Sequence, residues 1–153
     1  MHTIGIISDT HGLIRPEAIQ ALQGVDHILH AGDIGNPKVM EELRQIAPVT
    51  AVRGNVDCEA WSQAIQKTAI AEIDDRFFYV LHDLQTLDLD PAAAGFSAVI
   101  YGHSHEARQF TQNGVLYFNP GSAGPRRFHL PATIGCLHID GAHIYGEIIP
   151  LAC

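Results

Sequence analysis

The first two thirds of the chain alternate apolar segments with amphipathic stretches, and this alternation limits the available folds more than any other feature. The segment HTIGIIS leads into PEAIQALQG, which Pro16 opens and Gly24 closes as expected for a short helix. VDHILHAGD then leads into PKVMEELRQIA, where Pro37 suits a first helical position, and PVTAVRGN supplies a third strand. Strands that alternate with helices are typical of a parallel sheet covered by helices.

The remaining segments predict further strands and two hairpins. AIAEIDDRFFYVLHD predicts two strands with a turn near Asp74–Asp75, and DPAAAGFSAVIYG predicts a short helix, ended by Gly95, before another strand. Asn113–Gly114 and Asp140–Gly141 each lie between apolar runs, which is the pattern of a β-hairpin. Helices over parallel strands, followed by antiparallel hairpins, predict a layered α/β sandwich with mixed sheets.

The length and composition favour one domain over residues 1–153, because 46% hydrophobic content in 153 residues can bury a substantial core. No segment approaches the roughly 20 apolar residues that cross a bilayer, and the start lacks a basic leader. Three cysteines, Cys58, Cys136 and Cys153, are widely spaced and form no C-x-x-C motif. We therefore expect a cytoplasmic protein without membrane contact.

The charge of the chain argues against a long nucleic acid as its partner. Seventeen acidic residues against nine lysines and arginines give a formal charge of −8, and the only adjacent basic pair is Arg126–Arg127. Tight binding of a polynucleotide favours a dense basic stripe, which this chain lacks. We expect a small ligand instead. Apolar edge strands could pair between copies of the chain, so a homo-oligomer stays open.

Five of the apolar segments end in residues that can bind a metal ion. The seven candidates are Asp9, His11, Asp33, Asn55, His82, His103 and His105. Ligand sites of open α/β sheets lie outside the carboxyl ends of the strands, so side chains far apart in the sequence can meet there. Any one of these residues alone is more often a turn or capping residue, and it is the set that predicts a site.

The spacing and chemistry of these seven residues indicate how they meet and which metal ions they suit. Asp9-x-His11 and His103-x-His105 share a two-residue spacing, which directs side chains of a strand to one side. Gly32 and Gly54 leave room for tight turns before the residues that follow them. Carboxylate, imidazole and amide ligands without thiolates suit Mn²⁺, Fe or Zn²⁺.

Six short motifs carry a resemblance to a known family. They are D-T-H at 9–11, G-D at 32–33, G-N-V-D at 54–57, the histidine at 82, G-H-S-H at 102–105 and N-P-G-S at 119–122. In this order, over almost the whole chain, they resemble the calcineurin-like metallophosphoesterases, and within them the small single-domain phosphodiesterases of bacteria and archaea. The resemblance implies a four-layer α/β/β/α sandwich, in which helices flank two mixed β-sheets.

The resemblance also implies a mechanism and a set of ligands. One divalent ion would be bound by Asp9, His11, Asp33 and His105, and a second by Asp33, Asn55, His82 and His103. Mn²⁺ is the expected metal, with Fe, Ni²⁺ and Zn²⁺ as alternatives. Two such ions, about 3.5–4 Å apart, would hold a bridging hydroxide in line with the phosphorus of a small phosphoester, which this branch implies to be a phosphodiester, so no protein nucleophile is required.

The chain departs from the family pattern at two positions. Larger phosphatases of the family have a proton-donating histidine where this chain has Val56, which leaves the leaving-group acid unassigned. Many relatives have glycine where this chain has Asp83, to which we assign no catalytic role. Asp57 is the candidate catalytic residue, acting through hydrogen bonds that orient the ligands. An Asx-turn or a helix cap is an equal alternative for Asp57.

Other polar residues allow two interpretations each. Arg53 suits either a phosphate contact or an ordinary ion pair. FNPGSAGPRRF could offer backbone N–H groups and arginines to a phosphate, although Pro120–Gly121 alone indicates only a turn. Five histidines stay structural or unexplained, with His129 as the best candidate for a substrate contact: His27, His30, His129, His138 and His143.

Two alternatives to hydrolysis stay open at this point. The same family branch includes a retromer subunit that uses the fold as a protein-binding scaffold. A scaffold tolerates the loss of metal ligands, whereas all seven positions carry suitable residues here. A histidine-rich metal-binding module without chemistry would need local clustering of histidines, which the chain does not show.

Overall fold

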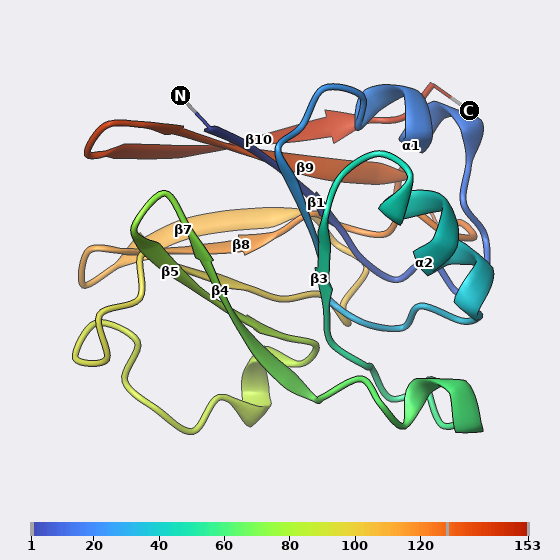
Figure 1. Cartoon of the computed structure of the whole chain (residues 1–153), viewed down its shortest axis with the longest axis horizontal. Coiled ribbons are helices and arrows are strands. Elements are labelled where there is room, and N and C mark those ends of the chain that lie inside the picture. Colours follow the sequence, from blue (N-terminus) through green and yellow to red (C-terminus); the bar gives the residue numbers. More distant parts are fainter. Residues whose placement is uncertain (1, 128, 153) are drawn as a thin grey trace.

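The computed structural model describes residues 2–127 and 129–152 and contains two five-stranded β-sheets that face each other (Figure 1). The first sheet has the order β10-β9-β1-β2-β3 and consists of β1 (His2–Ile7), β2 (His27–His30), β3 (Val49–Ala51), β9 (Thr133–Asp140) and β10 (His143–Pro150). The second has the order β4-β5-β6-β8-β7 and consists of β4 (Thr68–Ile73), β5 (Arg76–Leu81), β6 (Ala98–Ile100), β7 (Arg108–Gln112) and β8 (Val115–Asn119).

Both sheets combine parallel and antiparallel strands, which confirms the predicted mixed architecture. The pairs β1–β2, β2–β3, β5–β6 and β6–β8 are parallel, and the other pairs are antiparallel. Both predicted hairpins form, with left-handed φ angles of 51° at Asn113 and 78° at Gly114 in the first. In the second, Asp140 pairs with His143, so the loop is residues 141–142.

Two short helices cover the outer face of the first sheet (Figure 1). They are α1 (Pro16–Ala21) and α2 (Pro37–Arg44), and each begins at the predicted proline. Asn36 caps α2, because its Oδ1 accepts hydrogen bonds from the N–H groups of the first helical turn. Two 3-10 helices, η1 (Ala60–Ser62) and η2 (Leu84–Thr86), complete the helical elements. No helix in the described ranges is long and apolar enough to cross a membrane.

The main core lies between the two sheets. Alternate residues of the facing strands point into it, and the fully buried members include Ile4, Ile6, Phe78, Ile100 and Phe118. Burial of a side chain of this size contributes about 1.5–3 kcal/mol relative to its exposure. The sheets are therefore held face to face by apolar packing, and their strand ends form the platform for polar residues.

The helix predicted within DPAAAGF is wrong. Residues 91–95 form a single turn, in which Asp90 Oδ1 accepts from Ala92 N at 3.1 Å and Asp90 O from Ala94 N at 3.0 Å. Gly95, at φ 85°, then ends the turn before the cost of helix nucleation is recovered. The outer face of the second sheet is instead covered by η2 and the loop that follows it, whose apolar side chains pack against Tyr79 and Tyr101.

Candidate metal centre

The residues predicted as metal ligands follow strands that end at one edge of the two sheets. Asp9 and His11 follow β1, and Asp33 follows β2. On the second sheet, His82 follows β5, while His103 and His105 follow β6. The structure brings five of the seven candidates into two groups that share Asp9 and could each hold a metal ion: Asp9, His11 and His105, and Asp9, Asp33 and His82.

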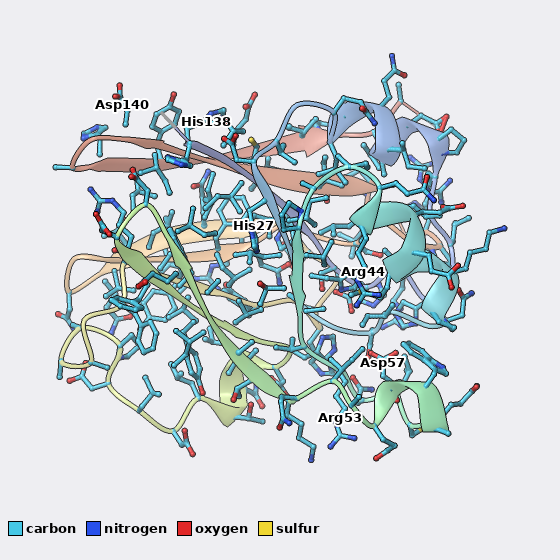
Figure 2. All side chains as sticks on the ribbon, viewed as in Figure 1. His27, Arg44, Arg53, Asp57, His138 and Asp140 are labelled. Carbon is cyan, nitrogen blue, oxygen red and sulfur yellow. The ribbon has the colours of Figure 1, made fainter. Side chains whose placement is uncertain are left out.

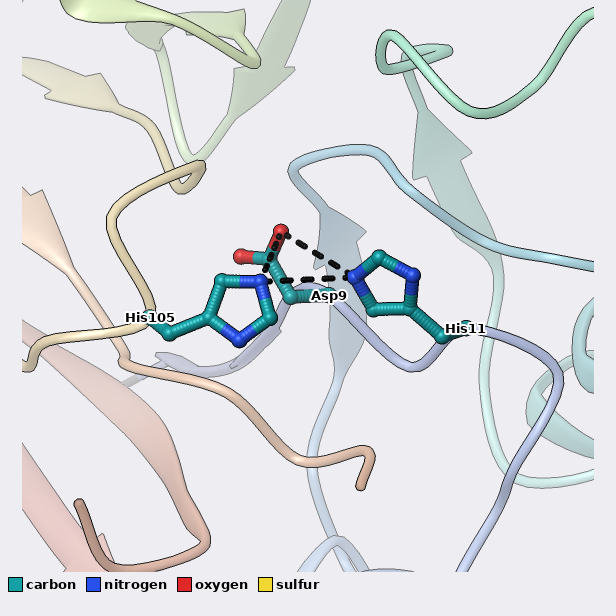
Figure 3. Close-up of side chains that lie close together, drawn as sticks. All are labelled: Asp9, His11 and His105. Atoms are coloured by element: carbon teal, nitrogen blue, oxygen red, sulfur yellow. Dashed lines mark hydrogen bonds and ion pairs between the residues drawn. The ribbon is translucent and has the colours of Figure 1, made fainter. Parts of the chain in front are cut away.

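The first group joins the turn after β1 to the loop after β6 (Figure 3). Asp9 Oδ1 lies 3.5 Å from His105 Nε2 and 3.9 Å from His11 Nε2. The two imidazole nitrogens lie 3.3 Å from each other. Three potential donor atoms therefore converge on one point, which is the arrangement that a coordinated cation requires.

The second group lies beside the first, shares Asp9 with it and adds Asp33. Asp33 Oδ2 lies 3.2 Å from His82 Nε2 and 3.6 Å from His11 Nε2, so one oxygen reaches toward both groups. Asp9 Oδ1 also lies 3.8 Å from His82 Nε2. Both carboxylates therefore lie between the two groups of imidazoles, not Asp33 alone.

The two remaining candidates lie at the side of the second group. His103 Nδ1 faces His82 Nε2 at 3.3 Å, and its Nε2 lies 4.0 Å from Asp83 Oδ2. Asn55 is exposed and lines a cavity of about 230 Å³ together with His82 and His103. Among the described residues it forms no hydrogen bond with the other six, so the structure places it next to the group without bringing it into contact.

The backbone is strained at most of these positions. Among the described residues, eight that are not glycine have left-handed φ, and three of them belong to hairpin turns. The other five are site candidates: Asp9 (55°), His11 (48°), Asp33 (56°), His103 (75°) and His105 (65°). Such conformations cost about 1–3 kcal/mol each and are typical of functional sites.

Glycines make room for this packing, as the sequence predicted for Gly32 and Gly54. A Cβ atom on Gly54 would overlap Asp33 Oδ1, and one on Gly32 would lie 2.7 Å from His82 Nδ1. A Cβ atom on Gly102 would overlap Ser8 Oγ. The loops can approach the carboxylates this closely only because these positions lack side chains.

Hydrogen bonds orient the polar atoms of the site. Asp9 Oδ2 accepts from Ser8 Oγ at 2.8 Å and from His103 N at 3.1 Å, and Asp33 Oδ1 accepts from Val56 N at 3.1 Å. His82 Nδ1 donates to Ala31 O at 2.8 Å, which turns Nε2 toward the carboxylates. One oxygen of each carboxylate is thus anchored while the other faces the imidazoles.

The electrostatics of the site favour a cation. Burial and nearby Arg127 lower the pKa of His105 to about 4, so its imidazole is neutral and able to coordinate. Burial disfavours protonated His82, but the hydrogen bond to Asp33 and the charge of Asp9 outweigh it and raise the pKa of His82. Burial likewise works against ionised Asp33, yet its hydrogen bonds lower its pKa. The carboxylates therefore stabilise positive charge at this point.

One buried atom tests whether a divalent ion fits. Asp9 Oδ1 is buried and has no hydrogen-bond partner, whereas buried carboxylate oxygens are normally satisfied. It faces the Nε2 atoms of three histidines, His11, His82 and His105. A metal ion would satisfy this oxygen, and the oxygen and nitrogen donors match the ligands of divalent transition metals. The residues present therefore fit divalent ions.

Asp57 holds the loops together and does not face the ligand atoms. Its Oδ2 accepts from Ile34 N at 3.0 Å and Gly54 N at 2.9 Å, and its Oδ1 accepts from Gly35 N at 3.0 Å. These bonds join the loop after β2 to the loop after β3, and Figure 2 labels Asp57. They differ from both an Asx-turn and a helix cap, so the carboxylate of Asp57 ties two loops of the site together.

Two residues of the N-P-G-S motif hold the other loops, which the sequence did not reveal. Asn119 Nδ2 donates to Gly102 O at 3.1 Å, and Ser122 Oγ donates to Asp9 O at 3.1 Å. Three of the N–H groups in the segment predicted to bind phosphate already have acceptors within the protein. Their acceptors are Asn119 Oδ1 for Gly121 N, Ser8 O for Ala123 N and Ser122 Oγ for Gly124 N.

His30, which the sequence left unexplained, connects two loops of the site through hydrogen bonds. Its imidazole is fully buried, and burial lowers its pKa to about 4. Gly32 N donates to Nδ1 at 3.1 Å, so Nε2 carries the proton and donates to Thr10 Oγ1 at 3.0 Å. Thr10 Oγ1 in turn donates to Ile34 O at 2.8 Å. This chain of bonds links the turn after β1 to the loop after β2.

Three remaining candidates are placed as follows. Arg53 donates to Gln63 Oε1 at 3.2 Å and forms no ion pair within the described ranges. Asp83 Oδ1 caps η2 by accepting from Gln85 N at 3.0 Å, while its other oxygen faces His103. His129 is exposed, and none of the described cavities includes it.

Comparisons with known proteins identify the family of the chain. The family model of the calcineurin-like phosphoesterase superfamily domain matches residues 2–142. A probable metallophosphoesterase of Methanothermobacter thermautotrophicus is 34% identical over 158 residues, which cover 95% of this chain and 91% of that protein. A solved archaeal phosphodiesterase is 28% identical, with a TM-score of 0.78 over 96% of this chain and 99% of that chain.

A fungal protein shares the fold at lower identity. Vps29 of Chaetomium thermophilum is 16% identical, with a TM-score of 0.79 over 97% of each chain, which is a likeness of fold alone. The family model and the archaeal relative, by contrast, extend over most of the sequence. The chain therefore belongs to the calcineurin-like phosphoesterase superfamily.

Proposed function

We propose that the chain is a metal-dependent phosphoesterase that hydrolyses phosphodiesters. The observation that carries this proposal is the buried, unpartnered Asp9 Oδ1, which faces three imidazole nitrogens at the carboxyl ends of the strands. The superfamily match and the archaeal relative named as a phosphodiesterase support the reaction type. The sequence supplies every type of ligand that the reaction requires.

The ligand sets carry over from the sequence as part of the proposal. Asp9, His11, Asp33 and His105 would hold one ion, and Asp33, Asn55, His82 and His103 the other. Mn²⁺ is the proposed metal, and Fe, Ni²⁺ and Zn²⁺ accept the same donors. When bound, the two ions supply an activated water and positive charge for the phosphoryl oxygens.

The protein contributes orientation and charge around the reacting phosphate. Asp33 Oδ2, close to both His11 and His82, is placed to serve both ligand sets. Arg126 and Arg127 line a cavity of about 240 Å³ with His11 and His105, so their guanidinium groups can contact phosphoryl oxygens. These cations offset the net negative charge of the protein at the point where an anionic ester binds.

The side chain at position 56 cannot protonate the leaving group. It occupies the position of the family's proton-donating histidine, and its side chain is 43% exposed beside the site. An aliphatic side chain cannot donate a proton, so hydrolysis depends strongly on the acidity of the leaving group. A phosphodiester with an acidic phenol as leaving group is therefore the most suitable first substrate.

The test is hydrolysis of bis-p-nitrophenyl phosphate by chelator-treated protein before and after addition of Mn²⁺, Fe²⁺, Ni²⁺ or Zn²⁺. We expect activity only with metal. The control is Asp88→Asn, which removes an exposed carboxylate that is not a candidate ligand. Metal binding without hydrolysis of any phosphoester would refute the proposal and favour the scaffold function.

We further place the protein in the cytoplasm and assign it a small phosphoester substrate instead of a long nucleic acid. Cys58 and Cys136 are free thiols, which agrees with a reducing compartment. The surplus of acidic residues opposes tight binding of a polynucleotide. Binding of duplex DNA with a steep dependence on salt concentration would contradict this assignment.

A further inference from the structure

Two cations beside the metal centre have no carboxylate partner. Arg53 follows β3 and Lys67 precedes β4, and no ion pair of the described residues includes either of them. Arg53 Nη1 donates only to the neutral Oε1 of Gln63, and its Nε is buried without an acceptor. Every ion pair of the described residues involves a histidine, so the other lysines and arginines share this lack of a carboxylate partner. Arg53 and exposed Lys67 differ from them by their place, because both line one cavity with candidate metal ligands, where an anion from outside can reach them.

A backbone hydrogen bond holds the two segments that carry these cations together. Arg53 N donates to Gln66 O at 3.0 Å, which holds the segment before Lys67 against the segment after β3. Figure 2 shows Arg53 at the end of this segment, near Asp57. The cavity of about 230 Å³ that both cations line also includes three of the proposed ligands: Asn55, His82 and His103.

The size of the cavity limits what it can hold. Pockets that enclose a drug-sized ligand measure roughly 300–1,000 Å³, so 230 Å³ suits a phosphate-sized group better than a nucleobase. A second cavity of about 450 Å³ adjoins it at His103 and Asp83, and Leu84, Tyr101 and Arg108 contribute to its wall. The larger cavity has room for the organic part of an ester.

We propose that Arg53 and Lys67 form a subsite for a second anionic group, so that the substrate is a phosphoester that carries a further phosphate. This inference rests on the proposed function, because the reacting phosphoester would bind at the metal centre while the cations hold the second group. A guanidinium and an ammonium together are suited to phosphate, the first through directed hydrogen bonds and the second as a point charge.

The kinetic test uses two esters that differ by one phosphate. They are thymidine 5′-(p-nitrophenyl phosphate) and the same ester with a 3′-phosphate, each assayed with the Mn²⁺-loaded protein. We expect the parent to have the higher kcat/KM for the 3′-phosphorylated ester. Arg53→Gln should lower the ratio of the two kcat/KM values by roughly 10- to 100-fold, the value of a hydrogen bond to a charged group. Lys67→Gln should lower it in the same direction.

The control variant is Lys38→Gln, which removes an exposed cation on α2 and should leave the ratio unchanged. Equal kcat/KM values for the two esters in the parent, or an unchanged ratio in Arg53→Gln, would overturn the inference while the proposed function stands. Failure to hydrolyse either ester with any of the four metals would instead overturn the proposed function.

A binding test examines the same subsite without bound metal and without turnover. Inorganic phosphate is titrated into the metal-free protein while backbone amide resonances are followed by NMR. We expect shifts at residues 53–55 and 66–68, and their loss in the double variant Arg53→Gln/Lys67→Gln, whose thermal melting is measured in parallel. Shifts confined to Arg126 and Arg127, or an unchanged response in the folded double variant, would contradict the subsite.

Discussion

Replacement of Asp57 by asparagine tests whether one buried carboxylate holds the site together. The side chain is only 4% exposed and accepts three backbone hydrogen bonds, from Ile34, Gly35 and Gly54. Asparagine keeps the shape but replaces one oxygen with an amide NH₂ group, which faces a backbone N–H as a second donor. At least one bond is therefore lost, and the others lose their charge.

The size of the effect follows from these bonds. A hydrogen bond to a charged group contributes about 1.5–3 kcal/mol, against about 0.5–1.5 kcal/mol for a neutral one. Loss of one bond and weakening of two others gives a loss of about 2–5 kcal/mol in the free energy of unfolding. Small domains have a net stability of about 5–15 kcal/mol, so most of the variant should still fold.

The loops joined by Asp57 carry Asp33 and Asn55, so metal affinity should fall as well. We expect activity or metal affinity to fall by about 10- to 100-fold, as for other residues that orient ligands through hydrogen bonds. The measurements are urea unfolding of the metal-free protein, metal content by elemental analysis, and hydrolysis at saturating metal. Asp88→Asn serves as the control for the loss of a surface charge.

Two outcomes would refute this reasoning in different ways. An Asp57→Asn variant with the stability of the parent would show that the three bonds do not stabilise the loops. A variant that loses stability but keeps the metal affinity and activity of the parent would limit Asp57 to the fold and remove it from the machinery of the site.

Three further predictions test the centre. Asp33→Asn should lower turnover by several orders of magnitude and reduce metal content while thermal melting stays near that of the parent, since no core cavity forms; near-normal hydrolysis with both metals retained would contradict the bimetal assignment. Gly54→Ala should destabilise the protein by about 1–3 kcal/mol in urea unfolding, because the new methyl group overlaps Asp33, and an unchanged stability would argue against this packing. Burial lowers the pKa of His30 to about 4 from 6.5, so the unfolded chain binds the proton more tightly than the folded chain does. As the pH falls from 7 to 5, the free energy of unfolding of the metal-free protein should therefore decrease by about 2 kcal/mol. A His30→Gln variant should show a shallower pH dependence.

The sequence predicted those elements whose signals are local. Pro16 and Pro37 mark the helix starts correctly, and Asn113–Gly114 marks a hairpin, because each restricts the backbone at its own position. The helix expected within residues 91–95 fails because a segment of five residues that begins with a proline and ends with a glycine cannot extend beyond one turn. The helix propensity of single residues does not show whether a segment is long enough to form a helix.

The sequence indicated the candidate donors of the site and only part of what supports them. Strand ends that terminate in aspartate or histidine indicate where donors gather, since parallel strands share an edge. Asp57 was expected to act through hydrogen bonds, but its partners were not predicted, and the hydrogen bonds of Asn119 and Ser122 were not expected. They depend on which backbone groups lie opposite these side chains in the folded chain, and no spacing in the sequence encodes that. His30 was likewise hidden, because burial at the end of β2 makes it a neutral hydrogen-bonding residue.

The backbone strain at the site explains why several side chains around it form hydrogen bonds with backbone groups. Five left-handed residues at about 1 kcal/mol each, the lower end of their cost, together approach the net stability of a small domain. The hydrogen bonds of Asp57, Asn119 and Ser122 join the strained loops pairwise and offset part of this cost. A ligand that binds the folded state adds to its stability. The strained backbone at these five positions therefore has a consequence for the site, because it directs the donor atoms toward one another.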